Sequence, residues 1–96
     1  METLEFSFPA EHPVRGRAHV GVVGSGDLEI LIEPGSDSAE VQIHTSVPGY
    51  GEVWRLVLQR FIARHRCAAR WRIHDFGATP GVVALRLEQA LEASQR

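Results

Sequence analysis

Two runs of alternating apolar and polar residues meet at a short glycine-rich segment, and this arrangement constrains the fold more than any other feature. The runs are residues 17–23 and 28–33, separated by Gly-Ser-Gly-Asp at residues 24–27. Each run places its aliphatic side chains on one face: Ala18, Val20, Val22, Leu28, Ile30 and Ile32. Glycine, serine and aspartate are typical turn residues. The pattern therefore predicts two strands joined by a tight turn.

Ser25 lies at the tip of this turn, and a glycine stands on each side of it. Glycine has no Cβ, so the backbone can adopt a positive φ and another molecule can approach closely. We therefore interpret Gly24, Gly26 and Asp27 as the turn that presents the serine, and Ser25 as a hydroxyl suited to enzymatic modification. The same residues are also compatible with an ordinary hairpin turn without a function. Ser25 is not expected to be a catalytic nucleophile by itself, because no adjacent group can accept its proton.

Other catalytic and metal-binding patterns are missing. A nucleophile elbow requires glycine two residues before and after the serine, where this chain has Val23 and Asp27. A phosphate-binding P-loop requires a lysine, and the chain has none. The five histidines have no ligand spacing, and the single cysteine, Cys67, has no motif around it. We therefore predict no catalytic residue and no metal site, and interpret Cys67 as a buried or incidental thiol.

The remaining elements follow from periodicity. Further alternating runs predict strands over residues 4–8, 41–47 and 69–74. A helical stripe is formed by Val53, Trp54, Val57, Leu58, Phe61 and Ile62. Thr79 as N-cap and Pro80 as first residue begin a last helix, whose apolar residues are Val82, Val83, Leu85, Leu87 and Leu91.

The order of these elements is strands, helix, strand, helix, which predicts an α+β fold. We expect a mainly antiparallel β-sheet with two helices packed on one face, in a single domain over residues 1–96. The formal net charge of −2 gives no electrostatic argument for nucleic acid. No signal peptide or long apolar run is evident, so the expected location is the cytoplasm, without membrane contact.

Several stretches of the sequence resemble a known family. The sequence has VG at residues 20–21, GSGDLE at 24–29, TSV at 45–47, and DFGATPGVV at 75–83 followed by LRLEQAL at 85–91. Together they resemble the acyl carrier subunit of malonate decarboxylase, its delta subunit, and more distantly the acyl carrier subunit of citrate lyase. The resemblance extends from Leu4 to about Glu92. The common phosphopantetheine carrier is a helical bundle with Asp-Ser-Leu at a helix start, a tripeptide that does not occur here, so a helical bundle is not expected.

The resemblance implies a specific role for Ser25. In this family the matching serine carries 2'-(5''-phosphoribosyl)-3'-dephospho-CoA through a phosphodiester, and the thiol of that group carries acetyl or malonyl as a thioester. The implied protein is a carrier without catalytic activity of its own. The implied partners are the acyl transferase and decarboxylase subunits of the complex, a prosthetic-group transferase and a malonyl transferase.

Three alternatives and two local questions stay open. The chain could be a citrate-lyase-type carrier, a structural adaptor subunit that carries no cofactor, or a free-standing enzyme. Residues 75–83 are polar and glycine-rich. They are expected either to pack near the Ser25 turn, where the start of the following helix favours a phosphate, or to form a docking surface. The simpler interpretation is a capped strand-to-helix connection. Asp27 and Asp75 could act as an acid/base pair only if the fold brings their carboxyls together.

Overall fold

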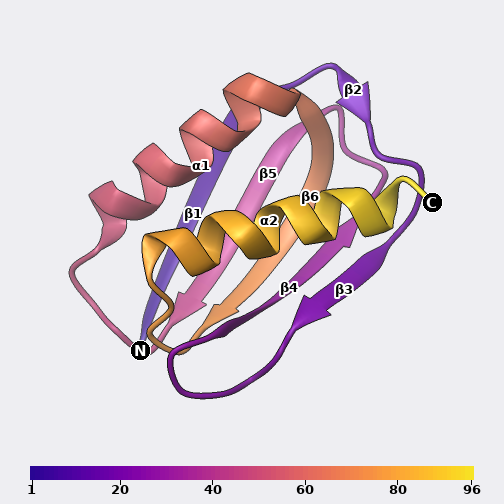
Figure 1. Ribbon diagram of the computed structural model, residues 1–96. Coiled ribbons are helices and arrows are strands. Elements are labelled where there is room, and N and C mark those ends of the chain that lie inside the picture. The colour runs from indigo at the N-terminus through magenta and orange to yellow at the C-terminus, as the bar shows by residue number, and fades with distance from the viewer.

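The computed structural model describes residues 1–96 and consists of one twisted sheet with both helices on the same face (Figure 1). The elements are β1 (Glu2–Pro9), β2 (His12–Pro13), β3 (Ala18–Gly21), β4 (Leu28–Glu33), β5 (Ser38–Thr45), α1 (Gly51–His65), β6 (Cys67–Asp75) and α2 (Pro80–Ser94). The main path of the sheet is β1-β5-β6-β4-β3. Three of its pairings are antiparallel, and β5 runs parallel to β6. The predicted α+β fold is therefore confirmed.

The core lies between the sheet and the helices. The strand side chains that face the helices alternate with polar ones, and the fully buried apolar ones are Leu28, Ile30, Ile32, Ala39, Ile43, Ala69 and Ile73. From α1, Phe61 places its ring against Trp71 of the central strand β6, with ring centroids 5.5 Å apart in an edge-to-face arrangement. Trp54 and Leu58 are also buried. Most of the predicted helical stripe thus packs on the sheet, but Val53 is 41% exposed.

The strand before the Ser25 turn ends earlier than predicted. β3 stops at Gly21, whose φ is +85°, and Val22 is 57% exposed instead of buried. A Cβ at Gly21 would lie 2.0 Å from the carbonyl oxygen of Leu28, so only glycine fits where the two strands come together. The chain bends away from the sheet at this glycine, and residues 22–27 form a loop instead of a two-residue hairpin turn.

The structure differs from the prediction in three smaller respects. β5 ends at Thr45, and Val47 lies in the following loop. Leu85 is 55% exposed on the outer side of α2, although its apolar character predicts burial. The short strand β2 was not predicted, because two residues carry no periodic signal. It pairs parallel with the start of β6, and His12 N–H donates to the carbonyl oxygen of Arg66 over 2.9 Å.

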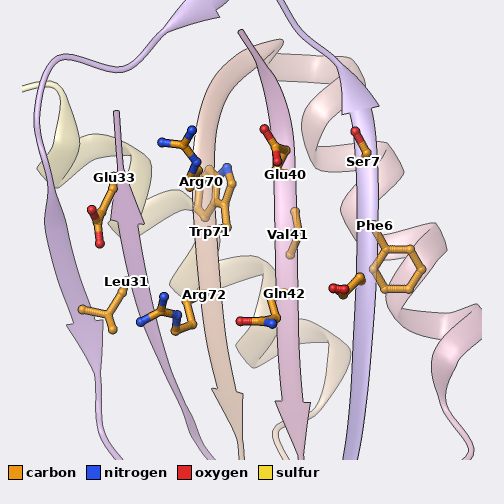
Figure 2. A pocket seen from close by; sticks show the side chains of 11 residues that line it. Phe6, Ser7, Leu31, Glu33, Glu40, Val41, Gln42, Arg70, Trp71 and Arg72 are labelled. Carbon is orange, nitrogen blue, oxygen red and sulfur yellow. The ribbon is translucent and has the colours of Figure 1, made fainter. Parts of the chain in front are cut away.

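The opposite face of the sheet has no helix over it. Figure 2 shows Arg70 and Arg72 of β6 on this face, beside Glu40 and Gln42 of β5. Charged side chains such as these are usually exposed to solvent, as they are on this face. The two helices pack on the other face, and neither is long and apolar enough to cross a membrane.

Candidate functional site

The Ser25 turn, defined as residues 24–27, is a hydrogen-bonded reverse turn. Asp27 N–H donates to the carbonyl oxygen of Gly24 over 3.1 Å, and Gly26 in the third position has a φ of +76°. A positive φ only at the third position is the signature of a type II turn, in which glycine is favoured. Ser25 occupies the second position and is exposed. The prediction that Ser25 lies at the tip of an exposed turn therefore agrees with the geometry.

The two glycines around Ser25 differ in backbone conformation, but neither is packed against other parts of the chain. Only Gly26 uses the positive φ that glycine permits. A Cβ at Gly26 would meet no atom within 4 Å, and at Gly24 the nearest atom would be Cγ2 of Val22 at 3.9 Å. Both glycines therefore leave space around the hydroxyl instead of filling space inside the protein.

Backbone bonds fix the turn to the segment after β6. Gly26 N–H donates to the carbonyl oxygen of Phe76 over 2.8 Å, and Phe76 N–H donates to that of Asp27 over 3.0 Å. These bonds place Gly26 and Asp27 together opposite the single residue Phe76, directly beyond the last pair of the β4–β6 ladder, Leu28 and Asp75. Residues 75–83 thus begin directly beside the Ser25 turn, as the first of the two hypotheses for this segment expected.

Asp27 also holds the turn through an ion pair with α2. Arg86 donates from Nε to Oδ1 over 3.1 Å and from Nη2 to Oδ2 over 2.6 Å. Leu28 N–H donates to the same Oδ1 over 2.7 Å. These bonds, the one from Arg86 first, lower the pKa of Asp27. Asp27 is therefore an ionised anchor whose two carboxylate oxygens accept hydrogen bonds from Arg86 and Leu28.

Arg86 is the residue that the sequence reasoning missed. It lies 59 positions after Asp27, and nothing in its local sequence distinguishes it from the other arginines of the chain. The pairing of Arg86 with Asp27 can be recognised only in the folded chain, where the start of β4 lies beside α2. Only a quarter of the Arg86 side chain is exposed, so the pair is partly shielded from water.

Asp75 is buried and organises the loop that leads into α2. Its Oδ2 accepts from the hydroxyl of Thr45 over 2.8 Å, and its Oδ1 accepts from Ala78 N–H over 3.0 Å. Gly77 N–H also donates to Oδ2, over 3.3 Å. Asp27 and Asp75 are therefore bound to separate sets of donors. The sequence left open whether they form an acid/base pair, and the geometry does not support it.

The start of α2 follows the predicted capping pattern. Thr79 has extended backbone angles, its Oγ1 accepts from Val82 N–H over 3.3 Å, and Pro80 is the first residue of the helix. The connection between β6 and α2 is thus both a well-capped helix start and the segment that borders the Ser25 turn.

Three histidines gather on the uncovered sheet face, which their sequence spacing did not indicate. Glu29 accepts from His19 Nε2 over 2.8 Å and from His74 Nδ1 over 2.9 Å, and the ring of His44 stacks on that of His74. These bonds, the one from His19 first, lower the pKa of Glu29. The residues come from four strands, so only the sheet register brings them together. Neither this group nor any other set of three His, Cys, Asp or Glu side chains is arranged to hold a metal ion.

Cys67 is buried at the start of β6, where burial raises the pKa of its thiol to about 11. The prediction of a buried thiol is confirmed, and the high pKa makes it unreactive at neutral pH.

Comparison with known proteins gives consistent matches over nearly the whole chain. The family model of the malonate decarboxylase delta subunit (MdcD) matches residues 15–94. The malonate decarboxylase acyl carrier protein of Pseudomonas aeruginosa (strain UCBPP-PA14) is 61% identical over 94 residues, which is 96% of this chain and 95% of that protein. The protein of the same name from Azotobacter vinelandii (strain DJ / ATCC BAA-1303) is 58% identical over the same shares of both chains. A chain in the crystal structure of a Pseudomonas malonate decarboxylase hetero-tetramer in complex with malonate superposes with a TM-score of 0.90 at 54% identity, covering 96% of this chain and 97% of that one.

Proposed function

The chain belongs to the malonate decarboxylase delta subunit family, and on this premise we propose that it is the acyl carrier subunit of a malonate decarboxylase, modified on Ser25. The carried group would be 2'-(5''-phosphoribosyl)-3'-dephospho-CoA, joined through a phosphodiester. When bound, it supplies a thiol that carries acetyl or malonyl as a thioester between the transferase and decarboxylase subunits. The observation that carries the proposal is the exposed Ser25 hydroxyl on a turn that is open on both sides.

The residues around Ser25 fit the attachment of such a group. A phosphodiester at the Ser25 Oγ would project from the second position of a type II turn, and the open space at Gly24 and Gly26 would accommodate it. The turn itself is held from behind by Phe76 and Arg86. A rigid turn keeps the attachment point fixed, while the mobility needed to reach different active sites resides in the arm. Tethering of this kind raises the local concentration of the acyl group, to the millimolar range for short flexible linkers.

The chain is proposed to be non-catalytic, because the only carboxylate of the turn, Asp27, is bound to Arg86. Formation of the Ser25 Oγ–P bond would displace a leaving group from an activated 5''-phosphate, and the hydroxyl proton would pass to a base of the transferase. The partners are proposed from the same premise. They are the acyl transferase and decarboxylase subunits of the complex, the prosthetic-group transferase and the malonyl transferase, and the matching solved chain is itself part of a hetero-tetramer.

The test is the intact mass of the protein after co-expression with its neighbouring genes, for the wild type and for Ser25→Ala. We expect a mass gain equal to that of the prosthetic group in the wild type and none in Ser25→Ala. Ser46→Ala is the matched control, because Ser46 is also exposed in a loop but is not flanked by glycines, and it should gain the mass. An active complex that contains only unmodified protein would instead indicate a structural adaptor subunit. The strong matches to malonate decarboxylase carriers favour a carrier of the malonate decarboxylase type over one of the citrate lyase type.

A further inference from the structure

An apolar groove of about 380 Å³ lies between the first halves of α1 and α2. Its apolar lining includes Val47, Val53, Trp54, Val57, Ala78 and Val83. Its polar groups are few, and the most buried of them, the carboxylate of Asp75, is already occupied by hydrogen bonds. A volume within the range of about 300–1,000 Å³ and a mainly apolar lining are typical of sites that bind small organic groups.

The groove begins beside the Ser25 turn. Gly77 belongs to its lining, and a Cβ at Gly77 would lie 3.9 Å from Cγ2 of Val47 and 4.0 Å from the backbone nitrogen of Gly26. The space above Gly77 is therefore bordered by the turn on one side and by the groove on the other. Because Gly77 has no side chain, this space remains open. The bonds between Gly26, Phe76 and Asp27 keep the turn and the groove in a fixed relation.

Apolar side chains are exposed in the groove and next to the Ser25 turn. Val53 is 41% exposed, Tyr50 53% and Val47 36%, and all three line the groove. Val23, which precedes the turn, is 62% exposed. A gathering of exposed apolar side chains in a concave area indicates a surface that is covered when the protein acts. Here the surface leads to the single residue proposed to carry a group.

We propose, on the basis of the proposed function, that this groove binds the acetyl-thioester end of the arm attached to Ser25. The acetyl thioester is neutral and small, so the apolar lining can cover it. The malonyl form carries a carboxylate, whose burial among apolar side chains and near the Asp75 carboxylate is unfavourable. The groove thus holds the acetyl form and leaves the malonyl form in solvent, available to the decarboxylase.

The main test measures how fast hydroxylamine cleaves the acetyl thioester on the intact modified protein, with free acetyl-dephospho-CoA as the reference. Covering the acetyl group and one neighbouring methylene favours the bound arm by about tenfold, so we expect cleavage to be about tenfold slower on the protein. Val53→Asp should restore the rate of the free thioester, because it places a charge in the groove. An acidic residue is favourable in the first turn of a helix, so α1 is expected to form in this variant.

The matched control is Leu56→Asp, on the same helix and 48% exposed but outside the groove. It should keep the slow rate. Methyl NMR of the wild type provides a readout that needs no variant, and acetylation should shift the methyl signals of Val53 and Val83, while malonylation should shift them much less.

Two results separate this inference from the proposed function. Absence of the mass gain on Ser25 would overturn both. A mass gain together with a cleavage rate equal to that of free acetyl-dephospho-CoA, and with unshifted groove methyls, would overturn the groove site alone. Shifts that occur only after addition of the partner subunits would also overturn it, and would assign the groove to a partner protein.

Discussion

Replacement of Asp75 tests how the loop beside Ser25 is held. Asp75→Ala removes the acceptor for the Thr45 hydroxyl and for the Ala78 amide, in a position that is only 3% exposed. Hydrogen bonds to a charged acceptor contribute roughly 1.5 kcal/mol or more each. The third donor, the Gly77 amide, lies in an exposed residue and can bond to water instead. We therefore expect Asp75→Ala to lower the free energy of unfolding by about 3 kcal/mol.

Asp75→Asn should cost much less. The amide oxygen of the new side chain can still accept from Ala78 N–H. Its NH2 group can donate to the hydroxyl of Thr45, which can donate in turn to the carbonyl oxygen of Val47, now 3.4 Å away. One weak bond, from Gly77, is lost, so about 1 kcal/mol is expected. In a domain of this size, 1 kcal/mol corresponds to roughly 4–8 °C in Tm.

Urea and thermal unfolding of the two variants give the comparison, with Asp37→Ala as the control because Asp37 is exposed in a loop far along the chain from this network. Equal losses for Asp75→Ala and Asp75→Asn would refute the reasoning, since they would show that the negative charge, and not the accepted bonds, is what matters. The rate of prosthetic-group transfer to Ser25, measured by intact mass under conditions where both variants are folded, extends the test to function. A wild-type rate in Asp75→Ala would mean that the order of this loop does not affect the presentation of Ser25.

Two further predictions concern the core and the ion pair. Trp54→Ala should lower the free energy of unfolding by about 3–5 kcal/mol, because it removes a large side chain that is 6% exposed, and urea unfolding against Leu56→Ala on the exposed side of α1 checks this. Arg86→Met should reduce the loss of stability on acidification. The pKa of Asp27 is lowered in the folded protein, so its contribution is present above the unfolded pKa of about 3.9 and is lost as the pH falls through the folded value. Thermal unfolding at pH 7 and at pH 3 should therefore differ less in Arg86→Met than in the wild type, and an unchanged difference would contradict the assignment.

The sequence predicted well the elements that carry a regular period or a clear start signal. The alternation in residues 28–33 and the capped start of α2 at Thr79 both correspond to what the structure contains. The prediction of strand ends fails where the conformation of a single residue determines where the strand stops. Gly21 ends β3 because of its φ and its contact with Leu28, which no hydrophobic pattern shows.

The surroundings of Ser25 could be predicted only in part, for a similar reason. The exposed turn is local and follows from its four residues. The bond from Arg86 to Asp27 and the approach of Gly77 to Gly26 depend on how distant elements meet. The cluster of His19, Glu29 and His74 is a third example, because its members become neighbours only through the register of the sheet.

The supports of the Ser25 turn differ in their sensitivity to solvent, and this determines which of them keeps the serine in place. The pair of Asp27 and Arg86 is partly exposed, so added salt weakens it. The backbone bonds of Gly26 and Phe76 are neutral and continue the sheet, and the Asp75 network behind them is buried. Neither responds strongly to salt. The position of the turn therefore depends mainly on the end of the β4–β6 ladder, and the ion pair adds to it from α2. It follows that loss of Arg86 should loosen the turn without releasing it, whereas loss of order at residues 75–78 should free Ser25 from the sheet.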